Sequence, residues 1–212
     1  MVKQKLFFPV TAFDADQELR VSGLACTRGA RQVFSDVAFH LKAGQALAVY
    51  GDNGSGKTSL LRLLAGLLAP QAGDVSLAHG PLALQSHYLG HVDGLKANLT
   101  VSETLRFTAR LFNGADTTFD LGDIGLTAYD EQRVGDLSAG QKRRLMLARL
   151  AIAPRQIWLL DEPLTALDKQ GRALIDTLAQ QHLAVGGMIL AASHEALGFA
   201  TQQLSLTQEA VR

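Results

Sequence analysis

The sequence of 212 residues predicts an α/β protein in which helices cover a parallel β-sheet. Short apolar segments typical of buried strands, such as residues 45–50 (QALAVY) and 156–161 (QIWLLD), alternate with segments of helical periodicity. This alternation favours a parallel sheet, because a helix usually forms the crossover between two parallel strands. A glycine-rich turn follows the first of these strands and leads directly into a helix, an arrangement that proteins use to hold phosphate groups.

The remaining elements follow in a regular order. Residues 18–42 have the alternating pattern of β-strands, interrupted by Gly29 and followed by Gly44. The helix after the glycine-rich turn is expected to stop near Pro70. Beyond it we expect a helix over residues 103–112, a polar, turn-rich segment over 113–135, a helix over 141–153, a strand over 156–161, a helix over about 168–184 and a strand over 188–193.

The composition argues against a disordered chain and against a free-standing nucleic-acid binder. Hydrophobic residues make up 47% and charged residues 19%, which is a globular balance. Lys+Arg and Asp+Glu number 20 each, so the basic excess typical of such binders is missing. The single cysteine, Cys26, excludes an internal disulfide and suits a reducing compartment. No apolar run approaches the roughly 20 residues that span a bilayer, and residues 1–17 are expected to form a tail rather than a signal peptide.

The glycine-rich turn, GDNGSGKT at residues 51–58, matches the Walker A pattern G-x-x-x-x-G-K-[ST] in full. Its glycines let backbone N–H groups approach phosphate oxygens, Lys57 can reach the β- and γ-phosphates, and the Thr58 hydroxyl can bind Mg²⁺. The alternative is an ordinary glycine-rich turn. The predicted ATP-binding residues are Gly51, Asp52, Asn53, Gly54, Ser55, Gly56, Lys57, Thr58 and Ser59, with Lys57 also acting in catalysis.

A second motif, IWLLDEP at residues 157–163, has the features of a Walker B strand. A buried strand delivers Asp161 at its C-terminal end, where parallel sheets bind ligands. We therefore expect Asp161 to hold Mg²⁺ and Glu162 to accept a proton from an attacking water. A surface Asp-Glu pair after a core strand is the alternative.

Three further segments, in this order and spacing, resemble the ATP-binding cassette (ABC) ATPases: LSAGQ at residues 137–141, TALD at 165–168, and the Ser193–His194 pair after the next strand. The resemblance implies a signature loop that closes on the nucleotide held by the other protomer of a head-to-tail homodimer with two ATP molecules. It implies that Asp168 couples the two sites and that His194 contacts the γ-phosphate and orients the water. The signature residues would be Leu137, Ser138, Ala139, Gly140 and Gln141.

The resemblance also implies the architecture. We expect a P-loop NTPase with a RecA-like parallel-sheet core, an antiparallel β lobe and a helical lobe over about residues 84–148, all within one domain over residues 18–212. The basic run Lys142-Arg143-Arg144 is expected to be a solvated helix face rather than a nucleic-acid site.

Two positions depart from the general family pattern. Arg28 stands where an aromatic residue usually stacks on adenine, and a guanidinium plane can also stack on a base. Ten residues before Val101, where the family usually has glutamine, the sequence has His91. An imidazole is a poor Mg²⁺ ligand, so His91 is expected to couple the nucleotide site to a neighbouring lobe or subunit rather than to hold the metal.

The segment LGHVDGLKANLTVSETLRF at residues 89–107 resembles one subfamily, the CcmA-type ATP-binding subunits of the haem exporters of cytochrome c biogenesis. That subfamily has histidine and arginine at the two departing positions. The resemblance implies integral membrane partners of the CcmB and CcmC type and a peripheral location at the cytoplasmic face of the bacterial inner membrane. The alternatives are a transporter ATPase for another substrate, a soluble ABC protein acting on ribosomes or DNA, and a regulatory binder without turnover.

Overall fold

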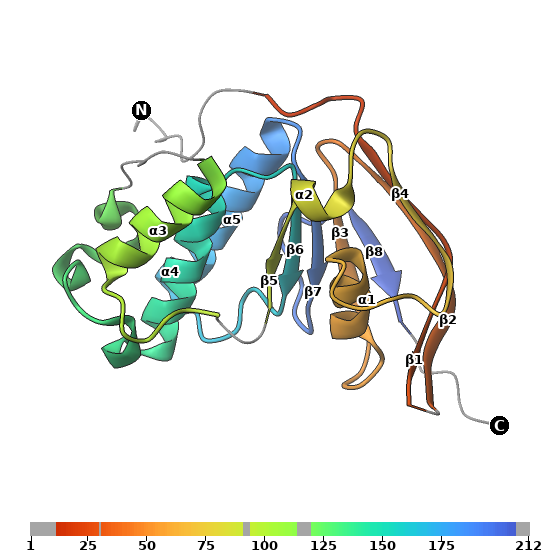
Figure 1. The fold of residues 1–212 in the computed structure, drawn as a ribbon, viewed down its shortest axis with the longest axis horizontal. Helices are drawn as coiled ribbons and strands as arrows, with labels where there is room; N and C mark the ends of the chain where they lie inside the picture. Colours follow the sequence, from red (N-terminus) through yellow and green to blue (C-terminus); the bar gives the residue numbers. More distant parts are fainter. Residues whose placement is uncertain (1–11, 30, 91–93, 114–119, 207–212) are drawn as a thin grey trace. The chain divides into compact units, whose positions relative to one another are not determined.

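A computed structural model of the protein describes residues 12–29, 31–90, 94–113 and 120–206 (Figure 1). The chain divides into two compact units. The sheet unit contains the described residues up to Gly90, residues 155–163 and residues 182–206. The helical unit contains residues 94–113, 120–154 and 164–181. Within the described residues the chain therefore enters the helical unit twice, and the second entry follows directly after Pro163.

The sheet unit is built on a five-stranded parallel sheet, which confirms the predicted α/β class. Its central strands β6 and β7 are fully buried along their length, as expected for a parallel sheet covered on both faces. In spatial order the strands are β5 (Ser86–Leu89), β6 (Ile157–Asp161), β7 (Met188–Ala192), β3 (Ala46–Tyr50) and β8 (Gln202–Ser205).

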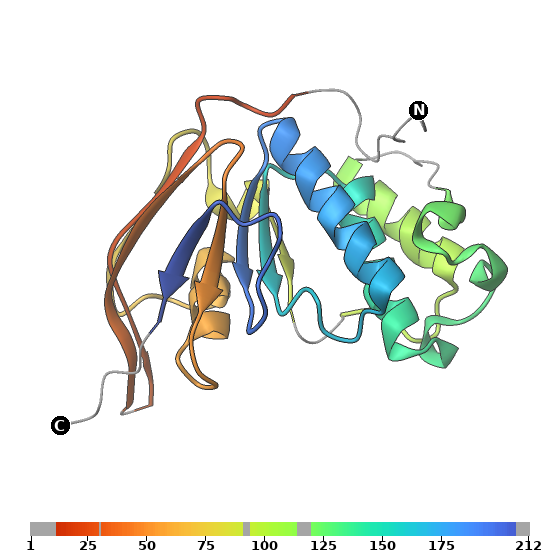
Figure 2. The same cartoon turned by 180° about the vertical axis from the view of Figure 1, so that it is seen from behind.

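A three-stranded antiparallel sheet completes the sheet unit, in the order β2 (Arg31–Lys42), β1 (Glu18–Arg28) and β4 (Ala72–Leu77). Helix α1 (Lys57–Leu64) lies between the two sheets in both views (Figures 1 and 2). Apolar side chains from β1, β2, β3, α1, β6 and β7 form one core there. The antiparallel sheet and the parallel sheet are therefore held together through the helix that follows the glycine-rich turn.

Helix α1 ends at Leu64, well before the predicted stop near Pro70. Gly66 has φ +73°, and the Leu67 N–H donates to the Arg62 carbonyl at 2.8 Å. This is the hydrogen bond of a Schellman cap, which requires a residue in the left-handed region just past the helix. The apolar residues beyond it continue the pattern but not the helix. A short helix, α2 (Leu82–Gln85), precedes β5.

The helical unit packs α3 (Val101–Asn113), α4 (Ala139–Ile152) and the first part of α5 (Lys169–Ala184). Residues of α3 and α4 share a core with apolar residues of the segment between them, and Leu174 of α5 packs against that core. From residue 120 on, where the predicted turn-rich segment is described, it contains three 3-10 helices, η1 (Leu121–Ile124), η2 (Thr127–Tyr129) and η3 (Val134–Asp136). Among the described residues, no helix combines the length and apolar character needed to cross a bilayer.

The bounds of this unit differ from the lobe expected over about residues 84–148 in two places. Residues 86–89 pair with β6 and therefore belong to the parallel sheet. Residues 164–181 join the helices, because α5 contributes to the helical core. The region that follows the Walker B motif in sequence is thus part of the unit that carries LSAGQ.

Candidate functional site

The glycine-rich turn after β3 is shaped by close backbone approaches. Gly56 has φ +103°, and a Cβ atom at this position would lie 2.6 Å from Val33 Cγ1 and 2.7 Å from Phe34 Cδ1. Gly51 lies against the Leu206 carbonyl, which leaves no room for a Cβ atom either. Only glycine fits these positions, so the antiparallel sheet and the end of β8 fix the path of the turn.

Lys57 is buried, with 7% of its surface exposed, and its ammonium is held within the turn itself. The Nζ atom donates to the carbonyls of Gly51 at 2.6 Å and Asp52 at 3.1 Å. Among the described residues, the buried Ser55 Oγ has no hydrogen-bond partner. A desolvated cation and an unsatisfied hydroxyl in a glycine-lined turn fit an anionic ligand such as a phosphate group.

The two predicted metal ligands lie together at the edge of the parallel sheet. The Thr58 hydroxyl is 3.1 Å from Asp161 Oδ1, and Asp161 is buried at the end of β6. Both groups offer hard oxygen ligands of the kind that Mg²⁺ prefers. Among the described residues, no group of three or more His, Cys, Asp or Glu side chains is arranged to hold a metal. A site with so few protein ligands suits a Mg²⁺ ion that takes its other ligands from phosphate oxygens and water.

Tyr88, which the sequence analysis did not identify as a site residue, also lies here. Its hydroxyl is 3.5 Å from Asp161 Oδ2. Burial raises the pKa of Tyr88, a hydrogen bond to Arg62 opposes this, and the charge of Asp161 adds to it. The phenol therefore stays protonated and can donate to the carboxylate. Tyr88 lies near the C-terminal end of β5, which pairs in parallel with β6. Since ligands bind at the C-terminal ends of parallel strands, this position could have marked Tyr88 as a site residue.

Glu162 and His194 form a pair at the same edge of the sheet, 3.3 Å apart between Oε1 and Nε2. Glu162 has φ +49°, in the left-handed region, and its N–H donates to the Ala192 carbonyl at 2.9 Å. A non-glycine residue held there is strained and commonly marks a functional position. The Ser193 hydroxyl accepts from the Glu195 N–H at 3.0 Å and so fixes the turn that carries His194. We call Gly51–Ser59, Asp161, Glu162 and His194 the P-loop site.

The LSAGQ segment lies in the helical unit, where its residues have separate structural roles. Ser138 caps α4, since its hydroxyl accepts from the Gln141 N–H at 3.3 Å. Gln141 returns the contact by accepting from the Ser138 N–H at 2.8 Å, which completes a capping box. Leu137 is buried in the helical core. The remaining free N–H groups of the first turn, at Ala139 and Gly140, point toward the N-terminal end of the helix, as an anion-binding loop requires.

Asp168 lies beside this loop in the helical unit. Its carboxylate accepts from Arg144 Nη2 at 2.6 Å through both oxygens and from the Gly171 N–H at 2.8 Å. The Gly171 N–H, and after it Arg144, lower the pKa of Asp168. A hollow of about 310 Å³, which we call the signature pocket, lies within the helical unit. It is lined by Gly125, Tyr129, Ser138, Gly140, Gln141, Arg144, Ala166 and Asp168.

The expectation of a solvated face for Lys142-Arg143-Arg144 is wrong. Arg143 is buried, Lys142 Nζ donates to the Gly135 carbonyl at 3.2 Å, and Arg144 is paired with Asp168. The helix turns these three successive side chains toward different parts of the unit. A run of basic residues does not reveal this, because burial and the Asp168 partner of Arg144, 24 residues away, depend on the fold.

The two departures from the family pattern remain predictions. Arg28 is exposed at the end of β1, where it pairs in register with Arg31 beside the hairpin turn. His91 lies outside the described residues.

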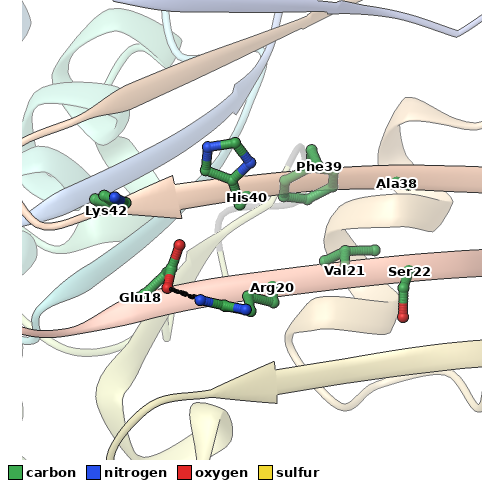
Figure 3. A pocket seen from close by; sticks show the side chains of 8 residues that line it. All are labelled: Glu18, Arg20, Val21, Ser22, Ala38, Phe39, His40 and Lys42. Atoms are coloured by element: carbon green, nitrogen blue, oxygen red, sulfur yellow. Dashed lines mark hydrogen bonds and ion pairs between the residues drawn. The ribbon is translucent and has the colours of Figure 1, made fainter.

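A separate hollow lies on β1 and β2, on the antiparallel sheet (Figure 3). Its charges are partly neutralised, since Glu18 Oε2 accepts from Arg20 Nε at 2.9 Å and Nη2 at 2.7 Å. This hydrogen bond lowers the pKa of Glu18. None of the predicted site residues lines this hollow.

The family model and the curated relatives that match this chain agree on one family. The sequence profile of the ABC transporter family matches residues 34–165. The cytochrome c biogenesis ATP-binding export protein CcmA of Rhodopseudomonas palustris (strain BisB5) is 47% identical over 190 residues, covering 87% of this chain and 95% of that protein. The protein of the same name from Bradyrhizobium diazoefficiens is 47% identical over 196 residues, covering 89% and 98%.

Solved structures share the fold at lower sequence identity. An ATP-binding protein of an ABC transporter from Pyrococcus furiosus superposes with a TM-score of 0.79 at 22% identity, covering 89% of this chain and 97% of that one. A structure of the ATP-binding subunit of an ABC transporter gives a TM-score of 0.76, also at 22% identity, covering 89% and 85%.

Proposed function

The chain belongs to the ABC transporter family, and on that premise we propose that it is the ATP-hydrolysing subunit of the haem exporter of cytochrome c maturation. The observation that carries the ATPase activity is the P-loop site, in which the Thr58–Asp161 and Glu162–His194 pairs lie at one edge of one sheet. The export role is supported by relatives that are 47% identical over nearly their whole length.

ATP binds with its phosphates in the turn formed by Gly51–Ser59. Lys57 leaves its carbonyl partners for the β- and γ-phosphate oxygens, and N–H groups of the loop cradle the phosphates. Thr58 and Asp161 would hold Mg²⁺, which when bound would supply positive charge to the phosphate oxygens. Arg28 would contribute by stacking on the adenine.

Hydrolysis is an in-line attack of water on the γ-phosphorus that yields ADP and phosphate. Glu162 accepts the proton of the attacking water, because its carboxylate projects from the strained turn at the end of β6. His194, whose Nε2 atom lies 3.3 Å from that carboxylate, orients the water and contacts the γ-phosphate. The strain at Glu162 fixes the base before the substrate arrives, so little reorganisation is needed.

The active form is a homodimer in which each nucleotide is completed in trans. The signature residues 137–141 belong to the helical unit, whereas Lys57, Asp161 and Glu162 belong to the sheet unit. The free N–H groups of α4 of one protomer contact the γ-phosphate held by the other, and Asp168 couples the two sites.

Export requires integral membrane subunits of the CcmB and CcmC type, so this chain works as a peripheral subunit at the cytoplasmic face of the bacterial inner membrane. His91 would couple the nucleotide site to these subunits. The chain would act as one ABC ATPase domain over residues 18–212, after a tail over residues 1–17. A transporter ATPase for another substrate is the remaining alternative.

The trans arrangement is tested by mixing two inactive proteins, Ser138→Arg and Lys57→Ala. Each homodimer has two defective sites, whereas a mixed dimer has one intact site, so an equal mixture recovers up to about a quarter of the wild-type ATPase rate. Lys57→Ala mixed with the doubly substituted Lys57→Ala/Ser138→Arg protein is the control, because no mixed dimer then has an intact site. Equal activity in both mixtures contradicts the arrangement.

The export role is tested by purifying the chain from detergent extracts of its own host and identifying the membrane proteins that accompany it. Haem attachment to c-type cytochromes is measured in cells that carry Glu162→Gln. Retention of cytochrome c maturation in these cells, with ATPase activity lost, contradicts the haem-exporter assignment and favours another substrate.

A further inference from the structure

We propose that Arg144 is a positioning residue, which grips the Asp168 carboxylate and so fixes the turn of residues 165–168 against the N-terminus of α4. The signature loop and this turn then reach the partner's nucleotide as one rigid piece. The inference rests on the proposed dimeric ATPase and assigns Arg144 a role in it that no motif carries.

The contact between Arg144 and Asp168 is short, and the arginine side chain is largely buried. Arg144 Nη2 lies 2.6 Å from both oxygens of Asp168, and only 15% of the Arg144 side chain is exposed, against 63% for Asp168. The second terminal nitrogen, Nη1, is 3.5 Å from the Ile124 carbonyl. The guanidinium is therefore held by the helical unit, and the exposed carboxylate is brought to it.

Two glycines in the signature pocket make this arrangement possible. Gly125 has φ +68°, and a Cβ atom there would lie 2.7 Å from Arg144 Nη1, so the glycine opens the path of the side chain. A Cβ atom at Gly140 would lie 3.1 Å from the Ala166 carbonyl, so the turn packs directly on the backbone of the signature loop. Ala166 has φ +62°, which is a conformation that an alanine keeps only when its surroundings hold it.

Asp168 also caps helix α5, in addition to its ion pair with Arg144. Its Oδ1 atom caps α5 by accepting from the Gly171 N–H, while its carbonyl accepts from the Arg172 N–H at 2.9 Å. The Arg144–Asp168 contact therefore ties α4 to α5 at the ends of both helices that adjoin the pocket. A movement of either helix end carries the other with it.

A rival role for Arg144 is direct contact with the partner's phosphates. The two roles differ in the effect of Asp168→Asn, which keeps the amide oxygen that caps α5 and removes the charge. If Arg144 positions the turn, Asp168→Asn weakens the dimer. If Arg144 binds phosphate, Asp168→Asn frees the guanidinium and strengthens the dimer.

The experiment uses the full chain with Glu162→Gln, which binds Mg-ATP without rapid turnover, and measures its ATP-dependent dimerisation by sedimentation. We expect Arg144→Gln and Asp168→Asn each to weaken the dimer about tenfold, and the double variant to be no weaker than either, because both remove one interaction. ATP binding to the monomer should be unchanged, and Arg144→Lys should restore part of the loss. Arg106→Gln is the matched control, because it removes an exposed cation of the same unit that contacts only Ser102 among the hydrogen bonds described.

The outcomes separate the two proposals. If the Glu162→Gln parent does not dimerise with ATP, the proposed trans dimer fails and the role of Arg144 fails with it. If the parent dimerises and Arg144→Gln dimerises equally well, the positioning role alone is overturned. Additive losses in the double variant, or a tighter dimer with Asp168→Asn, also overturn it.

Discussion

In the P-loop site the charged Lys57 is buried and lies close in sequence to its partners, whereas in the signature pocket the charged Asp168 is exposed and its partner comes from a distant segment. Lys57, 7% exposed, is held by the carbonyls of Gly51 and Asp52, six and five residues away. Asp168, whose side chain is 63% exposed, is held by Arg144, 24 residues away. The first site is a backbone cradle formed before the ligand arrives, and the second is an assembly of side chains on helix ends.

Because of this difference, substitutions should impair the two sites in different ways. A backbone cradle fails when a Cβ atom is added or when a reacting group is removed, and the loss is local. A pocket made by helix caps should lose its structure gradually as caps are removed, because each cap contributes only about 0.5–2 kcal/mol to stability.

Glu162→Gln should lower the ATPase rate by about 10²–10⁴-fold and leave ATP affinity nearly unchanged, because the amide cannot accept the proton of water. The measurement is steady-state phosphate release beside equilibrium binding of ATP. Glu131→Gln makes the same change at an exposed position of the helical unit and should be silent. If Glu162→Gln hydrolysed ATP at the wild-type rate, Glu162 would not be the general base.

Gly56→Ala should destabilise the protein by about 2–4 kcal/mol, because the new Cβ atom would overlap Val33 and Phe34 and because φ is +103°. Gly29→Ala is the matched control, since Gly29 has φ +60° but no atom within 4 Å of the added Cβ. It should cost only about 1 kcal/mol. Urea unfolding of both variants gives their losses in unfolding free energy, and the difference between the two losses is the part due to packing around Gly56. Equal losses would contradict tight packing around this glycine.

Gln141→Ala should destabilise the protein by about 1 kcal/mol through loss of the capping box. Gln141→Glu sharpens the comparison, because it keeps the acceptor for the Ser138 N–H but places a negative charge where phosphate should bind. We expect near-native stability with a lower ATPase rate for the glutamate variant. A parallel loss of stability and activity would mean that the loop acts only as a helix cap.

The smallest expected effect is a dependence of stability on pH, which comes from a histidine buried in the sheet unit. Burial lowers the pKa of His182 from 6.5 to about 3. The folded state therefore keeps the ring neutral while the unfolded chain takes up a proton below pH 6.5, so stability falls as the pH falls. Between pH 7 and pH 5.5 the loss is about 1 kcal/mol. The lowered pKa of Asp168 acts in the same direction but only at more acidic pH, below its ordinary value of 3.8.

His182→Phe should remove this pH dependence. The ring of His182 stacks on Trp158 with centroids 3.9 Å apart and an interplanar angle of 9°, and phenylalanine can keep that stack. Because the variant also loses the contact with the Gln156 carbonyl, the quantity to compare is the change in unfolding free energy between the two pH values. An unchanged slope would mean that other groups carry the pH dependence.

The parts of the site that sequence could predict are those made by neighbours in the chain. The glycines of residues 51–58 imply the cradle, and Asp161 and Glu162 follow from the end of a buried strand. Tyr88 and the Arg144–Asp168 pair depend on which strands and helices lie side by side, and no local pattern encodes that.

The same reason explains the elements that were not predicted. Strands β4 and β8 are short, polar and only partly buried, so they lack the apolar pattern of the central strands. They become strands because β1 and β3 offer them unpaired edges. The fully buried strands β6 and β7, by contrast, were predicted nearly to the residue.

The junction after Glu162 has a consequence for tolerance to change in chain length. The chain leaves the sheet unit at Pro163 and enters the helical unit at Leu164, so one residue with a fixed φ separates the base from the other unit. An inserted residue here would lie next to the left-handed backbone of Glu162 and is expected to turn its carboxylate away from His194. A library of single-residue insertions should therefore show a gap in function at this junction, whereas the exposed end of β1 at Arg28 and Gly29 should accept extra length.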